Sequence, residues 1–103
     1  MRILEAAESI ISYTDKISYE EFVNDKKTID AVIRNFEIIG EAVKLLPTIL
    51  KNKYPEINWQ RIRGFRNRII HDYFGVDLSK VWTIIQTQIM ELKNNIHKIL
   101  SEI

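Results

Sequence analysis

The sequence has no cysteine, three glycines and two prolines in 103 residues, and its longest uncharged stretch runs only from Val81 to Met90. Without cysteine, neither a disulfide framework nor a Cys-ligated zinc site can form, and two histidines are too few for an ordinary zinc site. The uncharged stretch is too short to span a bilayer. Few glycines and prolines argue against many short strands, so the composition favours a helical bundle.

The sequence also has almost no excess of positive over negative charge, since 15 basic residues against 14 acidic ones leave a net charge of +1. A protein this close to neutral has no bulk attraction for nucleic acid or acidic membranes, so any basic site must be a local cluster. Glu5 and Glu8 interrupt the apolar stretch that a signal peptide needs. We therefore expect one cytoplasmic domain over residues 1–103, without membrane association.

Apolar residues recur at helical spacing and predict an all-α, up-and-down bundle of four to five helices. Ser18 and Glu21 have the spacing of a capping box, and Asn58 is a good N-cap. Gly75 supplies a helix stop and Asp77 a cap for the last helix. Residues 48–54 are ambiguous, and the predicted helices cover residues 3–17, a short stretch after 18, 27–46, 59–74 and 78–101.

Two apolar stripes in the second half of the chain predict which side chains are buried. Trp59 opens the stripe of residues 59–74, where we expect it to lie in the core rather than to stack on a base. The stripe of the last helix begins at Val81 and ends on Ile96 and Leu100.

The segment from residue 57 to residue 71 holds four of the six arginines and no acidic residue. Such a run is commonly a solvated helix face. Arg66, however, falls on the apolar stripe of its helix, where a desolvated guanidinium needs a carboxylate, a phosphate or water. Glu37 and Glu41, one turn apart, are candidate carboxylate partners. The alternative is that they pair only with basic neighbours on the surface of their own helix.

His71 lacks the neighbours of a nucleophilic triad, and no di-iron or zinc-protease motif occurs in the chain. An imidazole next to arginines can move a proton while the guanidinium groups neutralise phosphate charge. This set suits the attack of a ribose 2′-hydroxyl on its own phosphodiester, which needs neither a metal nor a cofactor. The alternative is that His71 is a structural hydrogen-bonding residue.

Residues 66–73, Arg-Asn-Arg-Ile-Ile-His-Asp-Tyr, resemble the R-x4-H-x-Y motif of the HEPN superfamily. Residues 35–42, 54–59 and 73–77 resemble its HepT-like branch, so the resemblance covers essentially the whole chain in order. It implies an α-helical homodimer that acts as a metal-independent RNase, the toxin of a toxin–antitoxin pair. Its antitoxin partner is an MNT-type nucleotidyltransferase, which must be a separate protein because this chain leaves no room for it.

The resemblance also assigns roles to residues. It implies that Arg66 and His71 are the catalytic pair, and that Tyr73 is the residue the partner adenylylates (AMPylation). The substrate is RNA, with tRNA as one candidate. The residues that we expect to support RNA binding beside the catalytic pair are Arg63, Asn67, Arg68, Tyr73 and Glu41.

Helical geometry adds a hypothesis about the dimer. Residues five apart on a continuous helix point about 140° away from each other, so Arg66 and His71 of one subunit do not face one phosphate. Either the helix distorts or a two-fold axis brings both motif helices together into one cleft. Two alternatives remain: a catalytically silent HEPN dimer that binds nucleotide or docks on a nucleotidyltransferase, and a helical dimer without an active site.

Overall fold

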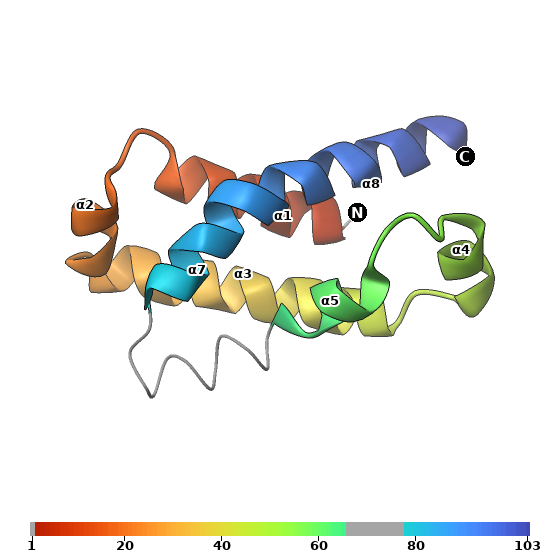
Figure 1. The fold of residues 1–103 in the computed structure, drawn as a ribbon, viewed down its shortest axis with the longest axis horizontal. Coiled ribbons are helices and arrows are strands. Elements are labelled where there is room, and N and C mark those ends of the chain that lie inside the picture. Colours follow the sequence, from red (N-terminus) through yellow and green to blue (C-terminus); the bar gives the residue numbers. More distant parts are fainter. Residues whose placement is uncertain (1, 66–77) are drawn as a thin grey trace.

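The computed structural model describes residues 2–65 and 78–103, which form an all-α bundle (Figure 1). Helices α1 (Arg2–Thr14), α3 (Lys26–Lys44) and α5 (Trp59–Arg63) alternate in direction along a long axis of 41 Å. The last helix returns along the bundle as α7 (Leu78–Ile84), a π-helical segment η1 (Ile85–Ile89) and α8 (Met90–Glu102). This confirms the all-α class predicted from the sequence.

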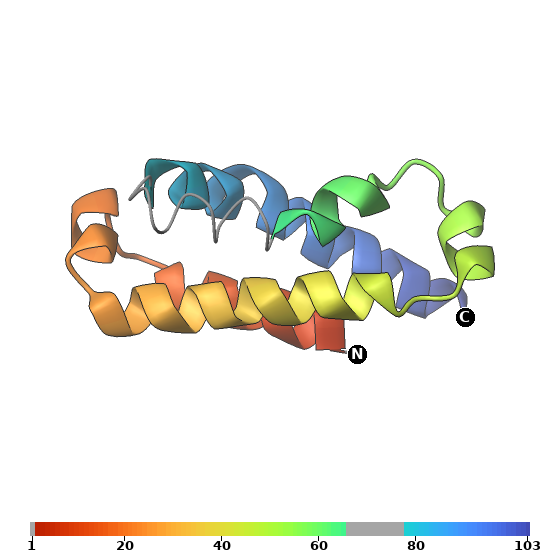
Figure 2. The same ribbon diagram turned by 90° about the horizontal axis from the view of Figure 1, so that it is seen from below.

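Two short helices lie at opposite ends of the bundle, as Figure 2 shows from a second side. They are α2 (Tyr19–Val23) and α4 (Thr48–Lys53), the second of which occupies the stretch that the sequence left ambiguous. With the last helix counted once, the described residues contain six helical segments rather than the four or five expected. None of these helices is long and apolar enough to cross a membrane.

Local capping fixes several helix ends. Ser18 and Glu21 form the predicted capping box, with the Glu21 N–H donating to Ser18 Oγ at 3.1 Å and the Ser18 N–H donating to Glu21 Oε1 at 3.0 Å. Asn58 Oδ1 accepts from the Arg61 N–H at 3.0 Å, as predicted for an N-cap. Each such cap satisfies a backbone donor that the first helical turn leaves without a partner.

Two predicted helices end earlier than expected. Helix α1 stops at Thr14 rather than Ile17, because Lys16 takes a left-handed conformation with φ of 63° that closes the helix. Helix α5 stops at Arg63, so the predicted helix 59–74 is interrupted at Gly64, which forms a turn and has the weakest helix propensity of any residue but proline. The predicted stop at Gly75 and cap at Asp77 lie outside the described residues.

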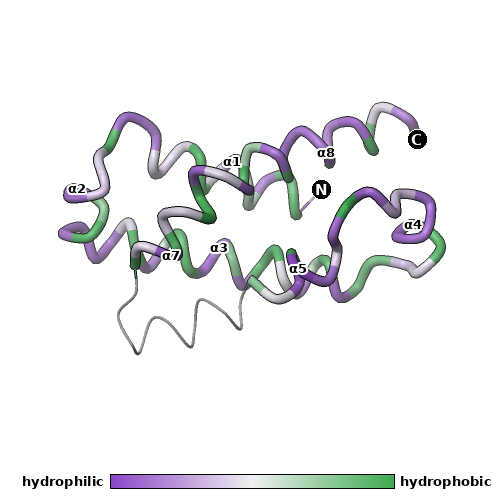
Figure 3. Tube along the Cα trace, viewed as in Figure 1, coloured by the Kyte–Doolittle hydropathy of each residue, from purple (hydrophilic) through white to green (hydrophobic). Residues whose placement is uncertain are grey.

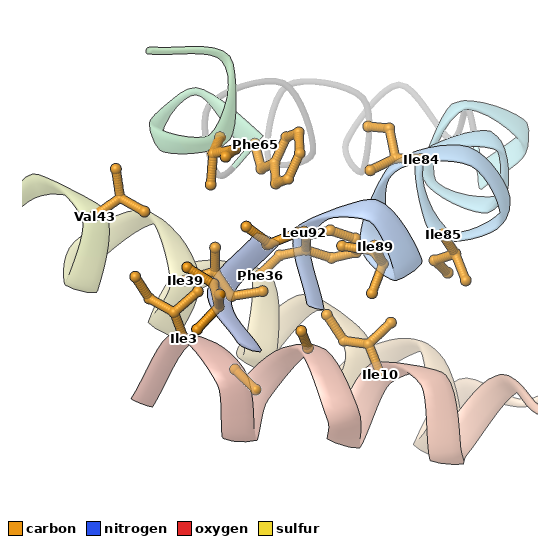
Figure 4. Packing of buried hydrophobic residues seen from close by; sticks show 14 of the residues in the cluster. Ile3, Ile10, Phe36, Ile39, Val43, Phe65, Ile84, Ile85, Ile89 and Leu92 are labelled. Carbon is orange, nitrogen blue, oxygen red and sulfur yellow. The ribbon is translucent and has the colours of Figure 1, made fainter. Parts of the chain in front are cut away.

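The core collects apolar side chains from α1, α3, α5 and the last helix (Figure 4). Figure 3 shows the hydrophobic residues recurring along each of these helices between hydrophilic ones. Each large aliphatic or aromatic side chain that is removed from water contributes about 1.5–3 kcal/mol to folding. Trp59 is buried, which confirms that it is a core residue. The fully buried residues include Ile3, Ile10, Phe22, Phe36, Ile39, Val43, Phe65, Ile89 and Ile96.

The last helix differs from its predicted stripe in one position. Leu100 is 41% exposed, whereas Ile99 is 1% exposed and completes the buried row after Ile96. Positions three and four beyond Ile96 lie about 60° and 40° to either side of it, so helical spacing alone does not separate them. The packing of the whole bundle buries the Ile99 side of the helix.

A hydrogen bond joins the residue that follows α4 to the C-terminal end of α8. The Tyr54 hydroxyl, which follows α4, donates to Glu102 Oε2 at 2.9 Å. Burial raises the pKa of the Tyr54 phenol above its usual 10.0, and the bond to Glu102 raises it further. This contact ties the chain just before α5 to the end of α8.

Candidate active site

Five of the seven predicted site residues, including both members of the catalytic pair, lie outside the described residues, and two supporting residues lie within them. Those within are Arg63, in the last turn of α5, and Glu41, on α3. The predicted site residues that lie outside the described ranges are Arg66, Asn67, Arg68, His71 and Tyr73.

The chain that leads into the motif is held firmly by the core. The ring of Phe65, directly before Arg66 in sequence, is 1% exposed and meets the ring of Phe36 edge-on, with centroids 5.7 Å apart (Figure 4). The indole N–H of Trp59 donates to the carbonyl oxygens of Lys51 and Tyr54, each at 3.2 Å. Aromatic packing and these bonds fix α5 against α3 and α4.

The chain that leaves the motif is held at the other end of the bundle. Helix α7 begins at Leu78, and its Val81 and Ile84 are buried. The ring of Trp82 packs against Phe22 and Tyr19 of α2, with centroids 5.2 and 6.0 Å apart. Both ends of the motif segment are thus attached to the core, which is the kind of support that a catalytic segment requires.

Helix α5 presents positive charge directly before the motif. Arg61 and Arg63 are exposed, and neither forms an ion pair within residues 2–65 and 78–103. Helix α5 itself carries no acidic residue. These two guanidinium groups, which have no acidic partner among residues 2–65 and 78–103, are candidates to bind the phosphates of a nucleic acid.

Glu41 lies on another side of α3 from Phe36, whose ring contacts Phe65. Residues five apart on a helix point about 140° away from each other, and Glu41 lines a groove between α1 and α3 of about 430 Å³ together with Arg2 and Arg34. Glu37 pairs with Arg34 at 3.8 Å, which is the surface pairing considered as an alternative from the sequence. A contact between Glu41 and Arg66 stays a prediction, because Arg66 lies outside the described residues.

A polar pocket that the sequence did not indicate lies between α5 and the last helix. It measures about 200 Å³, and Phe65 and Ile62 line it from the α5 side. Residues 88, 91 and 95 line it from the other side, and their spacing of three and four places them on one helical face. That polar row was the signal in the sequence that could have located them. The polar residues that line the pocket are Glu56, Asn58, Arg61, Gln88, Glu91 and Asn95.

Comparison with known proteins identifies the family. The family described as "Ribonuclease HepT-like" matches residues 3–99. A protein of Methanocaldococcus jannaschii named "Putative RNase MJ1216" is 44% identical over 98% of this chain and 84% of its own length. One of Thermococcus cleftensis named "Probable ribonuclease HepT" is 44% identical over 94% of this chain and 88% of its own. No solved structure matches the chain.

The family match spans nearly the whole chain, and the HepT-like resemblance that the sequence motifs carry agrees with it. The described helices agree with the all-α fold that this resemblance implies. The chain belongs to the HepT-like family of ribonucleases.

Proposed function

We propose that this ribonuclease is a metal-independent endoribonuclease that acts in the cytoplasm as the toxin of a toxin–antitoxin pair. The observation that supports this best is the intact R-x4-H-x-Y motif, with Arg66, His71 and Tyr73, in a chain that belongs to the HepT-like ribonucleases. A silent module has no physical need for all three residues together.

The proposed reaction is a transesterification within the RNA. His71 takes the proton of a ribose 2′-hydroxyl, whose oxygen attacks the adjacent phosphorus, and the bond to the 5′-oxygen breaks. The leaving 5′-oxygen receives a proton, so the products are a 2′,3′-cyclic phosphate and a 5′-hydroxyl. Arg66 stabilises the negative charge that develops on the phosphorane oxygens.

The described residues on either side of the motif are consistent with this role. Phe65 and Trp82 attach the two ends of the motif segment to the core, so the reacting groups sit on a supported segment. Arg61 and Arg63 add exposed positive charge for phosphates next to the one that is cut. In this proposal Asn67 and Arg68 contact the RNA backbone.

The proposal includes a homodimer and a separate antitoxin. The five-residue spacing of Arg66 and His71 favours a cleft at a two-fold axis, to which each subunit contributes both residues. The partner, an MNT-type nucleotidyltransferase, transfers AMP to Tyr73. The added phosphate then lies beside the arginines and takes the place of the substrate.

RNA cleavage in EDTA tests the proposal. Protein whose intact mass shows an unmodified Tyr73 is incubated with cellular RNA and with tRNA, beside a His71→Ala variant. We expect cleavage by the wild type alone, with 2′,3′-cyclic phosphate ends. Equal cleavage by both proteins, or none by the wild type, would contradict the assigned mechanism, and binding to a nucleotidyltransferase without cleavage would favour a docking module instead. A monomer with full activity at high dilution would contradict the shared cleft.

A further inference from the structure

The pocket between α5 and the last helix has the composition of a binding site rather than of a packing gap. Its inner wall is formed by buried apolar residues, Ile62, Phe65 and Leu92, and its rim carries amides, carboxylates and a guanidinium. Small flat ligands with several polar edges fit such a lining, because their edges can hydrogen-bond to the polar rim. An unstacked nucleobase is a ligand of this kind.

Gln88 supplies the second observation. Its Oε1 atom is buried and has no hydrogen-bond partner among the residues that the structure describes. An unsatisfied buried acceptor is destabilising, so native proteins retain few of them. Gln88 lies in the π-helical segment η1, and single π-turns occur frequently at functional sites. A ligand that donates an N–H to this side chain would satisfy it.

The charges of the rim select the class of ligand. Glu56 and Glu91 outweigh Arg61 by one negative charge, so the pocket disfavours a phosphate and favours N–H donors. Carboxylates and side-chain amides hydrogen-bond the amino groups of cytosine and adenine. Guanine also carries an exocyclic amino group. Uracil has none, and its single N3–H donor lies between two carbonyl oxygens that the carboxylates and Gln88 Oε1 repel. Arg61 can in addition stack its planar guanidinium on the base.

The position of the pocket relates it to the motif. Phe65 lines the pocket and directly precedes Arg66 in sequence. We propose that this pocket, built by Arg61, Gln88, Glu91 and Asn95, is a nucleobase subsite that holds a base with an exocyclic amino group next to the phosphate that is cut. This inference rests on the proposed RNA cleavage and adds a base preference to it.

Binding of short RNAs tests the subsite without requiring cleavage. Fluorescence anisotropy compares labelled hexauridylate with the same RNA carrying a single adenine, cytosine or guanine, using full-length His71→Ala protein so that the RNA stays intact. We expect at least one substituted RNA to bind about tenfold more tightly than hexauridylate, the discrimination that one good amide–base pair provides.

Two variants and one control locate the effect. In the same background, Gln88→Met and Asn95→Ala should reduce this preference to less than about threefold. Gln86→Met is the matched control, because Gln86 belongs to the same π-helical segment but is exposed and lines a different groove. Circular dichroism checks that each variant is folded.

Each outcome decides between the two proposals. Equal affinity for all the RNAs, or a preference that Gln88→Met and Asn95→Ala leave unchanged, would overturn the subsite. A preference that Gln86→Met removes as well would also overturn it. If the wild type does not cut RNA while the base preference persists and depends on Gln88, the subsite stands and the proposed nuclease mechanism fails.

Discussion

Phe65 links the core to the motif, so Phe65→Leu measures how strongly the core supports the site. The side chain is 1% exposed, and its ring meets Phe36 edge-on at 5.7 Å. Leucine keeps an apolar side chain at this position and loses the ring. The aromatic pair is worth about 0.5–1.5 kcal/mol beyond its buried area, and a swap that nearly conserves volume costs up to about 1.5 kcal/mol more.

The expected loss in the free energy of unfolding is therefore about 0.5–3 kcal/mol, which lowers the Tm of a domain of this size by about 2–24 °C. Urea unfolding followed by circular dichroism measures it. A double-mutant cycle with Phe36→Leu should give a coupling of about 0.5–1.5 kcal/mol, because both single changes remove the same ring contact.

The second readout is RNA cleavage per folded molecule, compared with Ile3→Val. Ile3 is fully buried in α1, far from the motif in sequence, and its substitution should cost about 0.5–1.5 kcal/mol. Displacing catalytic groups by about 1 Å can cost about a hundredfold in rate, so we expect Phe65→Leu to cut RNA far more slowly than Ile3→Val. Wild-type stability of Phe65→Leu, or equal cleavage by the two variants, would refute this reasoning.

Three further predictions concern local contacts. Ser18→Ala removes one half of the capping box and should lower the free energy of unfolding by about 1 kcal/mol, measured by urea denaturation. The hydroxyl and backbone N–H of Thr28 lower the pKa of Asp25, so the ionised Asp25 stabilises the fold above about pH 4. This stabilisation is lost as the pH falls, and the free energy of unfolding of Asp25→Asn should therefore decrease less than that of the wild type between pH 5 and pH 3. Burial raises the pKa of Tyr54, so its contribution to the free energy of unfolding is present below about pH 10 and is lost as the pH rises further; in an absorbance titration, Tyr54→Phe should lack a phenol that ionises above pH 10 in the wild type.

Features that depend on near neighbours in the chain could be predicted from the sequence alone. The capping box of Ser18 and Glu21 and the N-cap at Asn58 follow from spacing of three residues, and the structure contains both. The all-α class follows from the helical recurrence of apolar residues. The R-x4-H-x-Y motif identified the family for the same reason, since its members lie within eight residues of each other.

Helix ends and buried helix faces were harder to predict from the sequence, because several positions fit the same helical spacing. Ile99 and Leu100 both follow Ile96 at helical spacing, and the tertiary packing buries Ile99 and leaves Leu100 exposed. The interruption after Arg63 at Gly64 was missed because a continuous apolar stripe masked a single weak helix former.

Contacts between residues that are distant in the chain could not be predicted from the sequence, because they depend on how the helices pack. Arg61 and Gln88 are 27 positions apart in the chain, and they line one pocket because the fold places α5 and the last helix on opposite sides of it. The rotation of α3 about its axis turned Phe36 toward Phe65 and placed Glu41 in the groove with Arg2. Both results depend on how whole helices pack to exclude water from the core, a sum over many contacts that no short stretch of sequence contains.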